Sequence, residues 1–291
     1  MNYLVANPAA GAGTGGATLR ELLGELGVHT EAVDDGALAR TPPTADDRLI
    51  VAGGDGTVNR MARVCIAHGC ALGVIPTGTG NDFARGLGIP LDPAQACGVI
   101  ARGHEQFVDV CRANGSLYLN VLHVGLGAEV TRTVDARDKR WFGRLSYFRR
   151  LLDRCGDYRG FRSTVECNGA RMHGRWCEIA VANGSSFGGG TRVFEASPVD
   201  GKLDVIAVRP RLSSHLAMLW IRARVRRAVP DDDAVVYLRG RRCVITGGRP
   251  RQVTADGERV GLTPVEIEIL PRALRVAVPA DAGAGEARAT P

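Results

Sequence analysis

Two glycine-rich turns, each directly after an apolar run, constrain the fold of this chain more than any other feature of its sequence. The run Leu49–Ala52 leads into Gly53-Gly54-Asp55-Gly56-Thr57, and the run 71–75 leads into Pro76-Thr77-Gly78-Thr79-Gly80-Asn81-Asp82. We predict a helix after each turn, over 57–67 and over 82–87. Strands that alternate with helices form a parallel sheet with helices on both faces, and ligands bind beyond the carboxyl ends of its strands. Both turns are predicted to lie at that end of the sheet.

The segment before these turns extends the same pattern. Residues 3–7 and 28–33 are predicted strands, and the helical segment 17–26 between them places four leucines on one face, Leu19, Leu22, Leu23 and Leu26. We therefore expect residues 1–115 to form an α/β domain with a parallel, Rossmann-like sheet.

The pattern changes near residue 116. Short strand-like runs separated by turn residues follow, at 117–124, 162–168, 176–182, 203–208, 234–238, 242–246, 251–255, 265–270 and 273–278. They predict a β-rich antiparallel sandwich over residues 116–279, interrupted by helices at about 140–154 and 213–228. The Ala- and Gly-rich segment 280–291 is expected to be a disordered tail. A length of 291 residues suits two domains.

Composition bears on the compartment of the protein. No stretch approaches the ~20 consecutive apolar residues that cross a bilayer, and the first residues lack the basic and apolar regions of a signal peptide. The eight cysteines include no CxxC pair and several lie in apolar runs, which favours buried thiols in a reducing compartment. Cys65, His68 and Cys70 lie close together, but this is a weak signal for zinc. We expect a cytoplasmic protein.

Charge is distributed unevenly along the chain. Residues 1–115 have a net charge of −4, residues 116–278 have +11, and the tail has −1. A basic second half favours an anionic partner, either a membrane surface or a nucleic acid, although arginine can also serve only to solvate the surface. Few aromatic residues interleave with the basic clusters, so we expect no nucleic acid partner.

Two predicted helices carry much of this positive charge. The segment Arg137–Arg154 places Trp141 and Phe148 on a helix with interspersed arginines, and the segment 213–228 is similar. Such helices suit the surface of an anionic membrane, which would make the association peripheral. The alternative is that their apolar faces pack on the second domain.

The chemistry of the two turns points to phosphate. Glycine lets the backbone approach a ligand closely, and consecutive N–H groups at the start of a helix attract an anion. Asp55 beside a phosphate implies either a divalent cation between the two or a role as proton acceptor. Thr57, Asn81 and Asp82 can also be explained as helix caps. Two such turns on neighbouring strands favour a nucleoside triphosphate over a single small anion.

Other nucleotide-binding motifs fit less well. Gly11, Gly13 and Gly16 form a GxGxxG pattern with Asp34 and Asp35 about 20 residues further on, but a dinucleotide site leaves the later turns unexplained. A Walker P-loop and a protein-kinase signature both require a lysine, and residues 1–115 contain none.

Several motifs together resemble the bacterial diacylglycerol kinase family of lipid kinases, which is related to the sphingosine and NAD kinases. In the first half they are Asn7-Pro8-Ala9-Ala10-Gly11, Gly53-Gly54-Asp55-Gly56-Thr57-Val58-Asn59 and Gly78-Thr79-Gly80-Asn81-Asp82-Phe83-Ala84-Arg85. In the second half they are Tyr118-Leu119-Asn120-Val121, Val181-Ala182-Asn183-Gly184, Asp200-Gly201-Lys202-Leu203-Asp204-Val205 and Ala255-Asp256-Gly257-Glu258. The resemblance therefore covers nearly the whole chain.

The resemblance implies an α/β domain of the NAD-kinase and diacylglycerol-kinase type, and an enzyme that uses ATP and Mg²⁺ to phosphorylate a lipid hydroxyl, most simply that of diacylglycerol. It implies that the nucleotide is held by Asn7, Gly53, Gly54, Asp55, Gly56, Thr57, Asn59, Gly78, Thr79 and Asn81. It implies that Glu258 accepts the proton of the acceptor hydroxyl, with Asp55 as a second catalytic residue, and that a structural Mg²⁺ is held by Asp204 and the carbonyls of Gly201 and Ile206. Asp256-Gly257-Glu258 can also be a simple hairpin turn, and Asp204 a carboxylate at a strand edge.

One departure from the family pattern concerns the phosphate site. Arg60 stands where the family usually has Glu, so it either supplies a cation or impairs the site. A kinase of a soluble or natural-product hydroxyl, and a non-catalytic protein that binds nucleotide or lipid, therefore stay open. A homodimer is compatible with the sequence, which does not fix the oligomeric state.

Overall fold

The computed structural model describes residues 1–6, 15–133, 159–187, 191–192, 196–226 and 229–280. Asn7 and most of its glycine-rich loop, the predicted helix 140–154 and nearly all of the predicted tail lie outside the described residues. The chain divides into two compact units, one formed by Met1–Val108 with the chain from Arg272 onward, and one formed by Asp109–Pro271. We call them unit 1 and unit 2.

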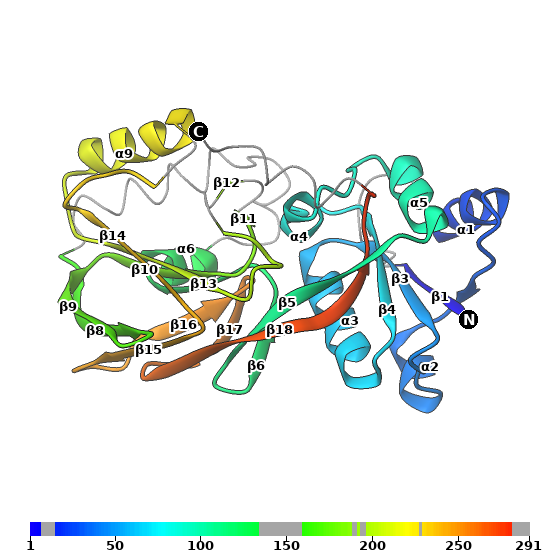
Figure 1. Ribbon diagram of the computed structural model, residues 1–291, viewed down its shortest axis with the longest axis horizontal. Coiled ribbons are helices and arrows are strands. Elements are labelled where there is room, and N and C mark those ends of the chain that lie inside the picture. Colours follow the sequence, from blue (N-terminus) through cyan, green and yellow to red (C-terminus); the bar gives the residue numbers. More distant parts are fainter. Residues whose placement is uncertain (7–14, 134–158, 188–190, 193–195, 227–228, 281–291) are drawn as a thin grey trace. The chain divides into compact units, whose positions relative to one another are not determined.

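Unit 1 is a parallel α/β structure (Figure 1). Its elements are β1 (Asn2–Ala6), α1 (Gly16–Glu25), β2 (Glu31–Ala32), α2 (Asp35–Arg40), β3 (Arg48–Gly53), α3 (Asp55–His68), β4 (Ala71–Pro76), α4 (Asp82–Gly86), α5 (Pro93–Arg102), the start of β5 (Glu105–Ala113) and the end of β18 (Val265–Ala277).

The sheet of unit 1 has the strand order β2-β1-β3-β4-β18, with all four neighbouring pairs parallel. The chain moves outward from β1 to β2 and then returns to the other side of β1 with β3, so the direction of winding changes between β1 and β3. Helices α1 and α5 pack on each other on one side of the sheet, and α3 lies on the other (Figure 1). Ligands of such sheets bind at the carboxyl ends of the strands near this change of direction.

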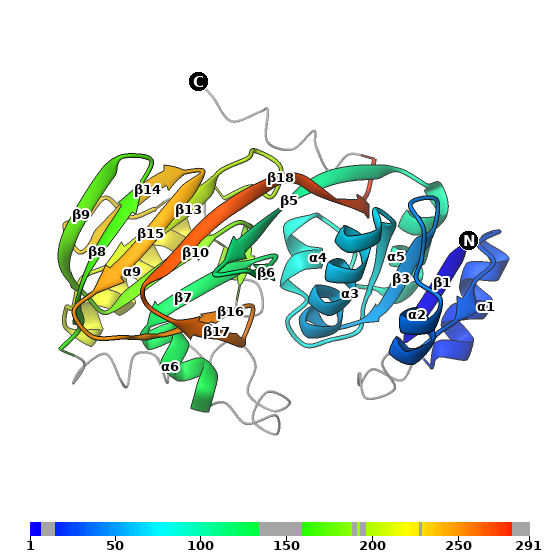
Figure 2. The same cartoon turned by 90° about the horizontal axis from the view of Figure 1, so that it is seen from below.

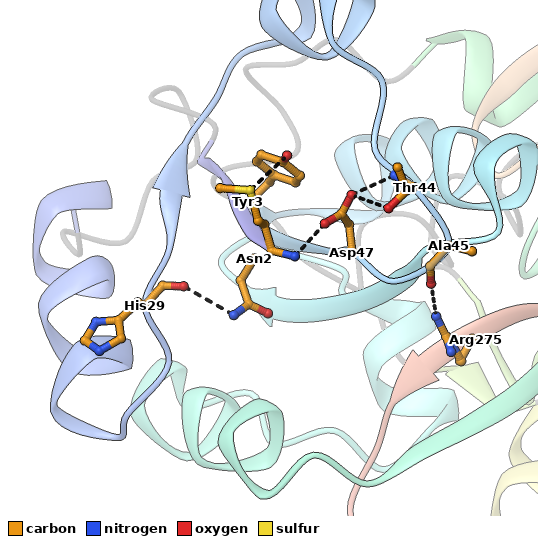
Figure 3. Close-up of polar contacts among 8 residues, drawn as sticks. Asn2, Tyr3, His29, Thr44, Ala45, Asp47 and Arg275 are labelled. Atoms are coloured by element: carbon orange, nitrogen blue, oxygen red, sulfur yellow. Dashed lines mark hydrogen bonds and ion pairs between the residues drawn. The ribbon is translucent and has the colours of Figure 1, made fainter.

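After Arg48, strand β3 is apolar because helices cover it on both faces. Leu49, Ile50 and Val51 are completely buried, as a central parallel strand requires. At the opposite end of the strands, Asp47 accepts hydrogen bonds from the Met1 ammonium group and from the N–H and hydroxyl of Thr44 (Figure 3). These donors lower the pKa of the Asp47 carboxyl from 3.8 to about 2.

Arg275 ties the last strand to the same end of unit 1. Its guanidinium donates to the carbonyl of Ala45 (Figure 3) and lies 3.3 Å from the carboxylate of Glu105. The chain therefore returns to unit 1 through β18 with polar contacts as well as strand pairing.

Unit 2 is an antiparallel β-sandwich. Its further elements are β6 (Ser116–Tyr118), β7 (Val121–Gly125), α6 (Leu126–Thr133), β8 (Phe161–Cys167), β9 (Ala170–Trp176), β10 (Glu178–Ala182), β11 (Ser186–Phe187), β12 (Thr191–Arg192), β13 (Leu203–Val208), α9 (Ser213–Arg226), β14 (Val235–Gly240), β15 (Arg242–Gly247), β16 (Gln252–Ala255) and β17 (Glu258–Leu262). One sheet has the order β14-β13-β10-β7-β16-β17, and the facing layer contains β18, β15, β8 and β9 together with β5 and β6 (Figure 2).

The two layers enclose one continuous apolar core. Side chains from both layers contribute to it, including the fully buried Trp176, Tyr118 and Leu122. The indole N–H of Trp176 donates to the carbonyl of Ser163 at 3.1 Å, so the largest buried side chain leaves no polar atom unsatisfied. The outer face of the six-stranded sheet carries α6, which packs on β7 and β16.

The expected fold class is confirmed, and several expected elements need correction. The run 117–124 is two strands, β6 and β7, and the runs 265–270 and 273–278 are one strand, β18. The expected strand 28–33 is reduced to the two residues of β2. Sequence patterns did not identify α2, α5, α6, β5, β9, β11, β12 or β17. In the part of the chain that the structure describes, no helix has the length and hydropathy needed to cross a bilayer.

Candidate active site

The first glycine-rich turn joins β3 to α3. Gly53 ends the strand and Gly54 is the N-cap of the helix. A Cβ at Gly53 would lie 2.8 Å from the Cβ of Thr57. The side chain of Thr57 therefore packs so close to the end of β3 that only glycine fits at position 53. Gly56 is exposed in the first turn of α3. The first N–H groups of this helix attract an anion to the carboxyl end of β3.

The second turn joins β4 to α4, and the side chain of Asn81 fixes its shape. The Asn81 amide oxygen accepts from the N–H of Gly78 at 3.0 Å, and its nitrogen donates to the carbonyl of Gly78 at 2.8 Å. Asn81 has a φ of 53°, a conformation that asparagine tolerates better than most residues. Arg85 donates to the carbonyl of Gly80 at 3.0 Å, and Thr79 between these contacts is exposed.

The two turns are in direct contact. A Cβ added to Gly78 would lie 2.5 Å from the Cα of Gly54, closer than any real side chain allows. The N–H of Thr77 donates to the carbonyl of Gly53 at 3.1 Å. The carboxylate of Asp55 accepts from the N–H of Phe83 at 3.1 Å and so links the start of α3 to the start of α4. The turns therefore form one backbone surface at the carboxyl ends of β3 and β4.

Two other residues of the first turn's motif are engaged within unit 1. Asn59 is buried and its side chain accepts from Arg63 one helical turn later, at 3.0 Å. Arg60 forms an ion pair with Asp35 at the start of α2, and both side chains are about half exposed. Asp34 caps the same helix by accepting from the N–H of Ala37 at 2.7 Å. Arg60 is therefore neutralised by a partner outside the turns, and the two aspartates of the dinucleotide hypothesis serve α2.

In unit 2, Glu258 lies directly after a tight hairpin turn. Asp256 and Gly257 form the turn between β16 and β17 with φ angles of 48° and 85°, and Glu258 pairs with Ala255 across it. Hairpin turns with positive φ at both central residues are common, because their twist matches the right-handed twist of the two flanking strands. The motif does form the hairpin that the sequence left open as an alternative, and Glu258 is the exposed first residue of β17.

The carboxylate of Asp256 anchors this hairpin to the junction between β6 and β7. It accepts from the N–H groups of Leu119 at 2.6 Å, and of Asn120 and Val121 at 3.0 Å each. The buried Asn183 joins the same junction by donating to the carbonyl of Leu119 at 2.9 Å. Three motifs far apart in the sequence therefore meet and fix the backbone that carries Glu258.

Asp204 lies in β13 and is completely buried. The hydroxyl of Tyr237 donates to its carboxylate, and the Nε of Arg239 lies 3.3 Å from the same oxygen. Arg239 stands directly opposite Asp204 in the pairing of β13 with β14. Arg239 also forms an ion pair with Asp200 in the turn before β13.

Comparison with known proteins places this fold and these motifs in one family. Residues 2–113 match the family model of the diacylglycerol kinase catalytic domain, and residues 120–278 match that of the YegS C-terminal NAD kinase β-sandwich-like domain. The chain belongs to the diacylglycerol kinase family. Family and fold together identify an enzyme of the kinase class.

Individual relatives are of moderate similarity. An uncharacterized protein of Synechocystis sp. is 30% identical over 248 residues, which are 81% of this chain and only 56% of that relative. A diacylglycerol kinase of Bacillus subtilis is 29% identical over 238 residues, 80% of this chain and 78% of the relative. The crystal structure of a candidate diacylglycerol kinase from Bacillus anthracis superposes with a TM-score of 0.79 at 26% identity, covering 97% of this chain and 96% of the other.

The side chains around Asp204 do not fit the divalent cation that the sequence resemblance implies. A guanidinium group and a phenol already contact the Asp204 carboxylate. Ile206 pairs with Ala180 on one side and Tyr237 on the other, so its carbonyl points at a paired strand. Among the described residues, no group of three or more His, Cys, Asp or Glu side chains could hold a metal ion, Cys65, His68 and Cys70 included.

The structure adds residues that the sequence analysis had not assigned. Arg85 holds the carbonyl of Gly80, Asp256 holds the hairpin of Glu258, and Arg239 compensates Asp204. Arg85 and Asp256 stand inside motifs that were recognised, so their position was a usable signal. Arg239 lies in no motif, and only the strand register could reveal it.

Proposed function

We propose that this protein is an ATP-dependent lipid kinase that transfers the γ-phosphoryl group of ATP to a lipid hydroxyl, with diacylglycerol as the acceptor and phosphatidic acid as the product. The observation that carries the proposal is the contact between the two glycine-rich turns at Gly54 and Gly78. Two helix starts in one backbone surface provide more N–H donors than a single small anion needs, and a polyphosphate chain matches this arrangement.

The nucleotide is proposed to bind along this surface. Gly53, Gly54, Gly56 and Gly78 allow the phosphates to approach the backbone, while Thr57, Thr79, Asn59 and Asn81 hold the turns or contact the phosphates. Asn7 belongs to the same proposal but lies outside the described residues.

A divalent cation that arrives with the nucleotide, which we expect to be Mg²⁺, requires only one or two protein carboxylates, because phosphates and water complete its shell. Asp55 fits as one such ligand, since its half-buried carboxylate lies at the start of α3 and is oriented by the N–H of Phe83. Such a cation would neutralise charge on the phosphates.

Glu258 is proposed as the group that accepts the proton of the acceptor hydroxyl. As the hydroxyl oxygen forms its bond to the γ-phosphorus, the bond from that phosphorus to the bridging oxygen breaks and ADP leaves, while the hydroxyl proton passes to the Glu258 carboxylate. The exposed position of Glu258 on a hairpin fixed by Asp256 supports this role, because a general base requires access and a defined position.

The acceptor is proposed to be reached at an anionic membrane surface through α9. Leu219 of this helix is buried, whereas Leu212 just before it, Met218 and Ile221 are 77%, 42% and 54% exposed. Exposed apolar side chains beside Arg222, on a part of the chain with net charge +11, complement an anionic bilayer by both hydrophobic insertion and charge.

The test uses purified protein, radiolabelled ATP and Mg²⁺, with and without vesicles that contain diacylglycerol and an anionic phospholipid. Labelled phosphatidic acid formed only with vesicles is the expected result. Label in a water-soluble product would contradict a lipid acceptor. Nucleotide binding without transfer to diacylglycerol, a long-chain base or a polyprenol would contradict catalysis and favour a binding protein.

Matched variants separate the parts of the proposal. Glu258→Gln is expected to lower turnover at least about 10²-fold while nucleotide affinity stays within twofold. Glu266→Gln, which removes an exposed carboxylate paired with Arg242 in the same unit, is the control and should keep normal turnover. The double variant Met218→Ser, Ile221→Ser should weaken vesicle sedimentation without changing nucleotide binding. Normal turnover in Glu258→Gln would refute the role of Glu258.

A further inference from the structure

Three carboxylates gather around the turn that leads into β13. Asp204 is completely buried, Asp109 is 1% exposed, and Asp200 is about a quarter exposed. Asp109 accepts from the N–H of Gly201 at 2.7 Å, and Asp200 accepts from the N–H of Lys202 at 2.9 Å. Burial raises the pKa of the Asp200 carboxyl, while the nearby Arg239 opposes this effect. So much negative charge away from water requires a compensating cation.

Arg239 supplies that cation from the neighbouring strand. Its guanidinium bridges two of the carboxylates, since it pairs with Asp200 and lies 3.3 Å from Asp204. A guanidinium is a planar fork of donors that serves two carboxylate groups at once, and it does not lose its proton in proteins. Tyr237, two residues earlier on the same face of β14, donates its neutral hydroxyl to the same oxygen of Asp204 that lies near Arg239.

We propose that Arg239 is the built-in cation of unit 2 and takes the place of a structural divalent metal in this chain. A divalent ion at the same carboxylate would lie within a few ångströms of a fixed positive charge, and the repulsion between them disfavours joint occupancy. Mg²⁺ also keeps several water ligands, whereas Asp204 is completely buried against protein groups. Unit 2 is therefore stable without metal.

A metal-free unit 2 also affects catalysis, provided that the protein is the kinase proposed above. Among the described residues, the metal requirement is then that of the nucleotide. Turnover should saturate once all ATP carries Mg²⁺, and a further excess of free Mg²⁺ should not activate the enzyme.

The test measures thermal unfolding and bound metal in the full chain without nucleotide. The wild type, treated with EDTA and then freed of it, is expected to hold less than about 0.1 divalent ion per chain and to keep its Tm within about 1 °C when Mg²⁺ is added. One divalent ion per wild-type chain that is lost in Asp204→Asn, or a Tm that falls on chelation and returns with Mg²⁺, would overturn the proposal.

Substitutions of Arg239 test directly whether its charge stabilises unit 2. Arg239→Gln removes the positive charge that faces Asp200 and Asp204, and it is expected to lower Tm by about 6 °C or more. Arg242→Gln is the matched control, because Arg242 pairs with Glu266 on the exposed surface of unit 2, and it should change Tm by less than about 2 °C. Equal effects of the two substitutions would contradict a special role for Arg239.

Should Arg239→Gln fail to fold, Arg239→Lys keeps the charge and is expected to fold with a Tm that chelation does not change. A Tm of Arg239→Lys that depends on added Mg²⁺ would equally overturn the proposal. Because these measurements need no turnover, their failure is distinct from failure of the kinase assignment.

Discussion

The substitution Gly78→Ala tests whether the contact of the two glycine-rich turns creates the nucleotide site. The new Cβ would lie 2.5 Å from the Cα of Gly54 and 2.9 Å from the amide oxygen of Asn81, whereas ordinary contacts begin at 3.4–4 Å. The turns must therefore separate by about 1 Å. Overpacking of this kind costs about 1–3 kcal/mol of stability, and a displacement of ~1 Å in a binding surface lowers function by about 10²-fold.

Alanine substitutions at two further glycines give reference points for the size of this effect. A Cβ at Gly54 would meet the Cα of Gly78 at 3.2 Å, so Gly54→Ala requires only a few tenths of an ångström and should have an intermediate effect. Gly24 lies in α1 with nothing within 4 Å of its Cβ position, and Gly24→Ala should raise stability by about 0.5–1 kcal/mol with unchanged nucleotide affinity.

The assay is calorimetric titration of each variant with MgATP, with circular dichroism to establish that the protein is folded. The expected order of affinity is Gly24→Ala equal to wild type, then Gly54→Ala, then Gly78→Ala. A folded Gly78→Ala protein that binds MgATP within twofold of wild type would show that the site lies elsewhere.

Two predictions concern the polar anchors of each unit. Asp256→Asn keeps a residue that tolerates the positive φ of the turn, but it points an N–H₂ group at the N–H of Leu119. The free energy of unfolding, measured in urea, should therefore fall by about 1–3 kcal/mol. An unchanged urea midpoint would refute the anchoring role of Asp256. The Asp47 carboxyl has a folded-state pKa of about 2 against an ordinary 3.8, so its contribution to stability is present above about pH 4 and is lost as the pH falls toward 2. The difference in unfolding free energy between wild type and Asp47→Asn should shrink over that range, and a pH-independent difference would contradict it.

Local signals in the sequence were sufficient for the parallel α/β unit. Glycine-rich turns between a buried apolar run and a helix allow few folds, and Leu49–Val51 could only be a strand buried on both faces. The motifs also identified the family, because their order along the chain is specific. The strands of unit 2 were harder, since β9 has few buried residues to mark it and β17 follows its neighbour after only two turn residues.

The sequence by itself determined the fold class and the two glycine-rich turns, because each depends on residues that are close together in the chain. Only the tertiary structure decided which charged side chains pair with one another. The sequence leaves open whether Arg60 supplies a cation to the phosphate site or impairs it, and the structure pairs Arg60 with Asp35 on another helix. The family resemblance implies a metal at Asp204, and the structure places Arg239 opposite it, in a strand 35 residues later. A charged side chain pairs with whatever the strand register and helix packing bring within a few ångströms, and no local pattern encodes that distance.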